Sequence, residues 1–230
     1  MIDIGGFIKV DTVNFPEKLA CTVFTRGCNF RCPYCHNPSF VNDFKEETYT
    51  EDEVFEYIKK RKMDALVVSG GEPCIQKDLK TFLQKAKELG VEIKLDTNGS
   101  CPDLLKDLVD SKLVDYVAMD IKTSPEKYNL VGFKNVDLIS KSIEIVKSMD
   151  SYEFRTTCAK PIVEVEDFAE IGKWISGAKK YNLQVFNNAI TLDENYRTHE
   201  SFTKEEFARS LDLLKENLGN IRVLGGDFGF

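Results

Sequence analysis

The feature that most limits the fold of this chain is a regular alternation of strand-like and helix-like segments. Segments rich in β-branched and aromatic residues predict strands, and most are followed by a segment with helical spacing or capping signals. Strands are expected at residues 20–25, 65–69, 91–96, 115–121, 152–158 and 183–186, with a short terminal one at 221–224. Helices are expected at residues 50–60, 78–89, 102–111, 137–149, 166–177 and 203–218. Six strand–helix units in one run predict an α/β protein with a parallel sheet and right-handed crossovers.

The length of 230 residues decides which parallel architecture these units favour. A complete eight-fold barrel typically takes about 250 residues, so six units predict an incomplete (β/α)6 barrel with parallel strands inside and helices outside. A doubly wound sheet of six strands is the alternative architecture. We expect one domain over 1–230, with its core at about 19–190 and a C-terminal helix and tail at 201–230.

Charge and hydropathy limit the partners and the compartment. The 31 Lys and Arg residues against 38 Asp and Glu residues give a net charge of −7. An acidic chain argues against nucleic acid as the main partner, because phosphate binding needs a basic face. No apolar run approaches the ~18 residues of a membrane helix, and the first ten residues lack the regions of a signal peptide. We therefore expect a cytoplasmic protein with no membrane partner.

The loop after the first predicted strand carries three of the seven cysteines, Cys28, Cys32 and Cys35. In a reducing cytosol such cysteines indicate metal binding, a cluster or catalysis rather than disulfides. Cys32 and Cys35 match a redox pair, and with His36 they match a haem attachment site. The three thiolates and His36 could instead bind zinc. A fourth interpretation is a [4Fe–4S] cluster held on three irons, which leaves one iron open to a substrate or cofactor.

Three of these four interpretations each have a different weakness. The redox pair leaves Cys28 unexplained. Haem attachment of this kind accompanies export, and the sequence shows no signal peptide. Zinc is disfavoured by the adjacency of Cys35 and His36, because structural zinc motifs usually space their last ligands further apart. The cluster uses all three thiolates.

Polar and glycine residues follow the next three predicted strands at the ends where the chain leaves them. Because the carboxyl ends of parallel strands lie at one edge, these residues predict one shared site. Glycines let the backbone approach a ligand, and carboxylates can accept from a cation. A plain turn, a helix N-cap and an ion pair are the structural alternatives. The residues concerned are Gly70, Gly71, Glu72, Pro73, Asp96, Thr97, Asn98, Asp120 and Lys122.

The cysteine spacing, the aromatic Tyr34 before the last cysteine and the Gly70–Pro73 segment together resemble the radical S-adenosylmethionine (SAM) superfamily. The resemblance implies one [4Fe–4S] cluster per chain, whose open iron is chelated by the amino and carboxylate groups of SAM. It implies that the backbone of Tyr34 contributes to the adenine site and that Glu72 grips the SAM ammonium. The cluster ligands implied are Cys28, Cys32 and Cys35.

Further segments resemble the glycyl-radical-enzyme activating family, and most closely the activating proteins of anaerobic ribonucleotide reductase. These segments are Phe24–Pro38, Leu95–Gly99, Asp115–Lys122 and Glu153–Thr157, and the likeness extends from about Gly5 to Lys180. It implies that Asp96, Thr97 and Asp120 surround a monovalent cation beside SAM. The implied SAM contacts are Tyr34, Gly70, Gly71, Glu72, Pro73, Thr97, Asn98, Lys122 and Arg155.

The activity implied by the resemblance is reductive cleavage of SAM. A flavodoxin or ferredoxin would reduce the cluster, and the 5′-deoxyadenosyl radical formed would take hydrogen from a backbone glycine of a partner glycyl radical enzyme. Anaerobic ribonucleotide reductase is the expected partner. One alternative is a radical SAM enzyme acting on a small molecule, as deazaguanine-forming synthases do. Another is a zinc-stabilised binding domain without catalysis. Cys74, Cys101 and Cys158 are expected to be small buried apolar groups.

Overall fold

The computed structural model describes residues 1–42 and 48–226. The expected end of the cysteine loop at about Asp43 and the last four residues of the C-terminal tail lie outside the described residues. The chain divides into two compact units. The first comprises Met1–Asn29 and Ser39–Ala118, and the second comprises Phe30–Pro38 and Met119–Phe230.

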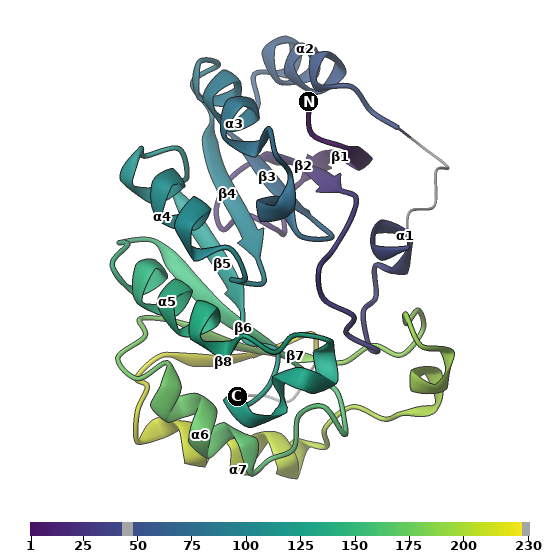
Figure 1. Ribbon diagram of the computed structural model, residues 1–230, viewed down its shortest axis with the longest axis vertical. Helices are drawn as coiled ribbons and strands as arrows, with labels where there is room; N and C mark the ends of the chain where they lie inside the picture. Colours follow the sequence, from purple (N-terminus) through teal and green to yellow (C-terminus); the bar gives the residue numbers. More distant parts are fainter. Residues whose placement is uncertain (43–47, 227–230) are drawn as a thin grey trace. The chain divides into compact units, whose positions relative to one another are not determined.

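The alternation expected from the sequence is confirmed (Figure 1). The elements up to the middle of the chain are β1 (Ile4–Asp11), β2 (Ala20–Thr25), α1 (Pro38–Val41), α2 (Glu51–Arg61), β3 (Ala65–Gly70), α3 (Leu79–Lys87), β4 (Glu92–Thr97), α4 (Pro102–Asp110) and β5 (Tyr116–Asp120). They continue with α5 (Val136–Lys147), β6 (Tyr152–Cys158), α6 (Asp167–Trp174), β7 (Tyr181–Val185), α7 (Lys204–Lys215) and β8 (Ile221–Leu224). Short 3₁₀ helices are η1 (Pro73–Ile75), η2 (Pro125–Val131) and η3 (Glu194–Thr198).

The strands are hydrogen-bonded in chain order, which confirms the α/β class. In the first unit, β2 pairs in parallel with β3, and β3 pairs in parallel with β4. In the second unit, β6, β7 and β8 are parallel in the same way. The carboxyl ends of the parallel strands within each unit therefore lie at one edge of the sheet, where the candidate site residues follow them.

One strand was not expected from the sequence. β1 runs antiparallel to β2, with Phe7 opposite Val23. Its residues do not alternate between buried and exposed positions, and Gly5 and Gly6 interrupt its apolar pattern. Because the alternation that identifies a strand is absent, neighbouring strand β2 rather than local sequence determines this pairing.

The core follows from the apolar positions of the same elements. Ala65–Val68 of β3 are all buried, as expected for a parallel strand covered on both faces. Leu79, Phe82 and Leu83 form the buried face of α3, which packs against β4. In the second unit α6 lies beside α7 (Figure 1). Among the described residues, no helix is long and apolar enough to cross a membrane.

Both helix starts expected from capping boxes are confirmed. Thr50 caps α2 and Thr203 caps α7, and in each case the hydroxyl accepts from the backbone N–H of a glutamate three residues on. Each glutamate, Glu53 and Glu206, accepts in return from the backbone N–H of its threonine. These reciprocal bonds satisfy N–H groups that the helix itself leaves without partners.

Candidate functional site

The glycine pair at the end of β3, Gly70 and Gly71, is packed against the beginning of the cysteine loop. Gly71 N–H donates to Thr25 O at 2.8 Å, and Glu72 N–H donates to Gly27 O at 2.8 Å. A Cβ atom on Gly71 would overlap the Gly27 carbonyl, and Gly70 has a φ of +110°. Both positions therefore require glycine, because the two backbones approach too closely for a side chain.

The Glu72 carboxylate holds the loop after β3 against the loop after β4. It is 1% exposed. It accepts from Thr97 Oγ1 at 2.7 Å, from Asn98 N–H at 2.6 Å and from Cys74 N–H at 3.0 Å. Burial raises the pKa of Glu72, and these hydrogen bonds oppose the rise. The structure thus shows a bracing role for Glu72, and its contact with the SAM ammonium stays a prediction.

Asn98 extends this bracing to the cysteine loop. Its amide Nδ2 donates to Asn29 Oδ1 at 3.0 Å, and its Oδ1 accepts from Ser100 N–H at 2.9 Å. Asn29 Nδ2 donates to Ser100 Oγ at 2.8 Å. Asn29 directly follows Cys28, so these bonds connect the first cysteine of the loop to the end of β4. Sequence reasoning missed Asn29 and Ser100, because isolated polar residues in loops carry no signal of their own.

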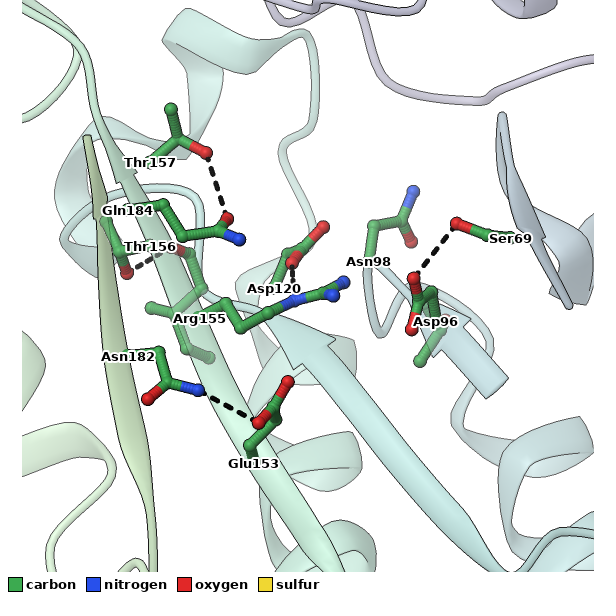
Figure 2. A network of polar contacts seen from close by, with 12 residues as sticks. Ser69, Asp96, Asn98, Asp120, Glu153, Arg155, Thr156, Thr157, Asn182 and Gln184 are labelled. Carbon is green, nitrogen blue, oxygen red and sulfur yellow. Dashed lines mark hydrogen bonds and ion pairs between the residues drawn. The ribbon is translucent and has the colours of Figure 1, made fainter. Parts of the chain in front are cut away.

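Asp96 lies in a second polar group of the first unit. Its Oδ2 accepts from Ser69 Oγ at 3.0 Å (Figure 2). Its Oδ1 pairs with Lys94 Nζ at 2.9 Å. The Lys94 ammonium also lies 5.9 Å from the centre of the Tyr116 ring. Lys94 was missed from the sequence, where a lysine inside a strand reads as a solvent-exposed residue. Only its position two residues before Asp96, on the same face of β4, could have suggested the pair.

In the second unit Asp120 accepts from two cations at once. Arg155 Nε donates to its Oδ1 at 2.9 Å (Figure 2). Lys122 Nζ donates to its Oδ2 at 2.8 Å. Burial acts to raise the pKa of Asp120, but the charges of Arg155 and Lys122 outweigh it and hold the pKa well below its ordinary value. The pKa of Lys122 is raised, because attraction to Asp120 outweighs burial. The Asp120 carboxylate therefore orients both the Lys122 ammonium and the Arg155 guanidinium.

Tyr34 presents an unsatisfied donor in the second unit. The residue is 4% exposed, and its hydroxyl has no hydrogen-bond partner among the described residues. Burial raises the pKa of Tyr34, and the charges of Lys122 and Asp120 also act on it. The phenol is therefore neutral and able to donate. A buried donor without a partner costs about 1–3 kcal/mol, so this hydroxyl is suited to a bound ligand or an ordered water.

Further polar side chains line β6 and β7. Figure 2 shows Asn182 donating to Glu153, at 2.9 Å, and Thr157 close to Gln184. Glu153 and Thr157 lie two residues before and after Arg155, so the three share one face of β6. This repeat of polar residues at every second position of a buried strand is a signal from which sequence reasoning could have found Glu153.

The second part of the cysteine loop is anchored by its own unit. Arg31 N–H donates to Val131 O at 2.8 Å, and Asp193 N–H donates to Pro33 O at 2.9 Å. The Phe30 ring stacks on Phe133 with 4.6 Å between ring centres. These contacts hold the backbone on both sides of Cys32.

The donor set of the loop fits a [4Fe–4S] cluster chemically. All seven cysteines lie in the described ranges, and none of them forms a disulfide. Cys28 belongs to the first unit, and Cys32 and Cys35 belong to the second. As the described residues stand, no three His, Cys, Asp or Glu side chains are grouped to hold a metal ion. Three thiols on one loop are nevertheless the ligand type that iron–sulfur clusters require.

The remaining cysteines differ in their surroundings. Cys158 is fully buried, and Cys21 is buried with a pKa raised by burial to about 12, as expected for small apolar groups. Cys74 is also buried, but its sulfur accepts from Thr97 Oγ1 at 3.6 Å. Cys74 therefore belongs to the network around Glu72. Cys101 is half-buried, with its sulfur 3.7 Å from Ser100 Oγ.

The fold and these loops define the class of protein. The model of the radical SAM superfamily matches residues 22–175, and the chain belongs to this superfamily. It is therefore an enzyme whose cofactors are a [4Fe–4S] cluster and SAM, which confirms both expected cofactors. Family membership favours the cluster over the redox-pair, haem and zinc interpretations of the cysteine loop.

Individual relatives that align over most of the chain are activating enzymes within this superfamily. A protein of Methanocaldococcus jannaschii that is named for glycyl-radical enzyme activation is 33% identical over 98% of this chain and 98% of its own. A second protein of that organism with the same type of name is 29% identical over 83% of this chain and 78% of its own. The pyruvate formate-lyase-activating enzyme of Clostridium pasteurianum is 27% identical over 85% of this chain and 90% of its own.

Solved structures agree on the fold. SuiB of Streptococcus suis bound to S-adenosylmethionine has a TM-score of 0.66 at 14% identity, covering 87% of this chain. The chain spans 49% of that SuiB structure. The enzyme anSMEcpe with bound AdoMet has a TM-score of 0.59 at 19% identity, covering 85% of this chain and 61% of its own. At these identities the likeness concerns the fold.

Proposed function

We propose that this chain activates a glycyl radical enzyme and that its protein substrate is an anaerobic ribonucleotide reductase. The observation that carries the activase proposal is the 33% identity, over 98% of both chains, to a protein named for glycyl-radical enzyme activation. The ribonucleotide reductase partner is supported by the resemblance of the segments Phe24–Pro38 and Asp115–Lys122 to activating proteins of that enzyme.

The cluster and SAM, when bound, would supply the radical chemistry needed to take hydrogen from a glycine Cα. The residues of the chain bind and orient them. Cys28, Cys32 and Cys35 would hold the cluster, and a flavodoxin or ferredoxin would supply the electron. Lys122 and Arg155 are cationic side chains that Asp120 orients, so they would suit the SAM carboxylate.

Two further groups would orient the ligand. The neutral hydroxyl of Tyr34 is a buried donor that a polar atom of the ligand can satisfy. The Glu72 and Asn98 network holds three loops of the first unit in one arrangement, the loops after β2, β3 and β4. Preorganised groups of this kind reduce the cost of ordering a bound ligand. Water and other hydrogen donors must also be excluded while a radical is present.

The test uses the anaerobically reconstituted protein, with dithionite as reductant and SAM. We expect 5′-deoxyadenosine, and in the presence of an anaerobic ribonucleotide reductase we expect a glycyl radical signal by electron paramagnetic resonance. SAM cleavage with transfer to a different glycyl radical enzyme, and none to the reductase, would overturn the partner. Cleavage with no radical on any glycyl radical enzyme would overturn the activase proposal.

A further inference from the structure

Tyr128 is a buried residue that the site described so far does not use. It lies in η2, in the loop that follows β5, and it is 1% exposed. Burial raises the pKa of the Tyr128 hydroxyl, so the phenol is neutral at physiological pH. Buried hydroxyls are normally engaged in hydrogen bonds. This one is bonded to the backbone of a candidate site residue, Lys122.

The hydroxyl oxygen holds the amide of Lys122. Lys122 N–H donates to Tyr128 Oη at 3.2 Å. The residues on either side of Lys122 are anchored by other partners. Ile121 N–H donates to Arg155 O at 2.8 Å, and the Thr123 hydroxyl donates to a backbone carbonyl at 2.6 Å. The bond to Tyr128 therefore completes the anchoring of this segment at the residue whose side chain carries the positive charge.

The ring of Tyr128 contacts the cysteine loop. It meets the Phe30 ring edge to face, with 6.3 Å between ring centres and an interplanar angle of 89°. Trp174 of α6 also packs edge to face against Tyr128, at 5.5 Å. Such arrangements are favourable for aromatic pairs. Phe30 lies two residues before Cys32, so Tyr128 connects the loop after β5 with the cysteine loop, within the second unit.

We infer that Tyr128 is a positioning residue for SAM, which acts by holding the Lys122 amide in place through its hydroxyl. Lys122 is then oriented at its ammonium by Asp120 and at its backbone by Tyr128. A side chain held at both ends loses less freedom when a ligand binds to it. The inference rests on the proposed contact between Lys122 and the SAM carboxylate, and it does not depend on which protein the chain activates.

Tyr128→Phe tests the inference, because it removes the hydroxyl and keeps the ring against Phe30. In anaerobic calorimetry on the reconstituted protein, we expect the dissociation constant for SAM to rise about tenfold, since Lys122 must now be ordered on binding. In the cleavage assay the KM for SAM should rise by a similar factor, while kcat at saturating SAM stays within about twofold. The iron content should equal that of the wild type.

Tyr152→Phe is the matched control. Tyr152 is also buried, and its hydroxyl also accepts from the amide of a lysine, Lys179 N–H, at 2.9 Å. This bond lies where β6 begins and just before β7, at the strand ends opposite to the loops of the candidate site. Both variants should lower the melting temperature to a similar extent, but only Tyr128→Phe should bind SAM more weakly.

A double-mutant cycle with Lys122→Met tests whether the hydroxyl acts through Lys122. Lys122→Met alone should weaken SAM binding, because it removes a cation from the proposed carboxylate site. Adding Tyr128→Phe to Lys122→Met should then change the dissociation constant by less than about twofold, since the side chain that Tyr128 positions is already absent. Additive losses would show that the hydroxyl acts by another route and would overturn the inference.

The remaining outcomes separate the inference from the proposed function. Wild-type affinity in Tyr128→Phe, with weakened binding in Lys122→Met, would overturn the inference and leave the Lys122 contact standing. Wild-type affinity in Lys122→Met would overturn that contact and the inference with it. Loss of iron or of the folded circular dichroism spectrum in Tyr128→Phe would show a general structural role for the hydroxyl, which also contradicts the inference.

Discussion

At the scale of single residues, Asp120 of the second unit is paired with two cations, Lys122 and Arg155. A carboxylate whose pKa is lower in the folded than in the unfolded state stabilises the fold above its unfolded pKa, about 3.9. The stabilisation is lost as pH falls from there toward the folded pKa. Asp120 has such a lowered pKa, and Arg155 is the largest opposing influence to its burial. The stabilising effect of Arg155 should therefore be present at neutral pH and fade in acid.

Arg155→Met tests this effect. We expect the free energy of unfolding at pH 7 to fall by about 1–3 kcal/mol, because a partly buried carboxylate loses one of its two partners. The difference from wild type should shrink below about pH 4, where the unfolded chain takes up the proton. Urea unfolding across this pH range measures it. Arg209→Met is the control, since Arg209 pairs with Glu166 on the exposed surface and should change stability by less than about 1 kcal/mol.

A constant difference at all pH values would show that Arg155 acts by packing alone.

The same variant, Arg155→Met, also tests the proposed ligand site. Removing one of two cations should weaken SAM binding, whereas Arg209→Met should leave it unchanged. If Arg155→Met bound SAM as tightly as wild type, Arg155 would not belong to the SAM site.

At the scale of secondary-structure elements, the close approach between the end of β3 and the loop after β2 sets the positions of the first unit's loops. Gly71 N–H donates to Thr25 O, and Glu72 N–H donates to Gly27 O. Neither bond is compatible with a side chain at Gly71, because its Cβ would overlap the Gly27 carbonyl. Gly71 is therefore required for packing between these two elements, and its contact with a ligand stays a prediction.

Gly71→Ala should separate these two loops. We expect a loss of about 1–3 kcal/mol in the free energy of unfolding, typical of an overpacked site. SAM affinity should fall about tenfold or more, because Glu72 and its partners move with the loop. Gly219→Ala is the control, since a Cβ there meets no atom within 4 Å. Unchanged stability and SAM binding in Gly71→Ala would mean that the loops are not held by this contact.

The same elements show what sequence patterns can and cannot predict. β6 and β8 begin and end at the residues expected, because β-branched and aromatic runs bounded by turns describe a strand well. β1 was missed, since its pairing depends on its neighbour rather than on its own pattern. The candidate residues at strand ends could be proposed from the sequence, because the carboxyl ends of parallel strands share one edge. Lys94 and Asn29 were missed, because their roles depend on side-chain partners that spacing does not reveal.

At the scale of the whole molecule, the cysteine triplet has members in both compact units. Cys28 belongs to the first, and Cys32 and Cys35 belong to the second. A group that binds only the folded chain stabilises it by mass action, so a cluster held by all three cysteines should add to the stability of the molecule. The backbone on both sides of Cys32 is hydrogen-bonded to other protein groups, so we expect the apoprotein to keep its fold.

Cys32→Ala separates cluster binding from folding. We expect the reconstituted variant to hold almost no iron, against about four per chain for the wild type, and to cleave no SAM. Its circular dichroism should match wild type, and its melting temperature should equal that of the wild-type apoprotein, below that of the loaded wild type. Cys101→Ser should keep both the iron and the higher melting temperature, because Cys101 is outside the triplet. A full complement of iron in Cys32→Ala would remove this cysteine from the cluster, and with it the ligand set on which the proposed activity depends.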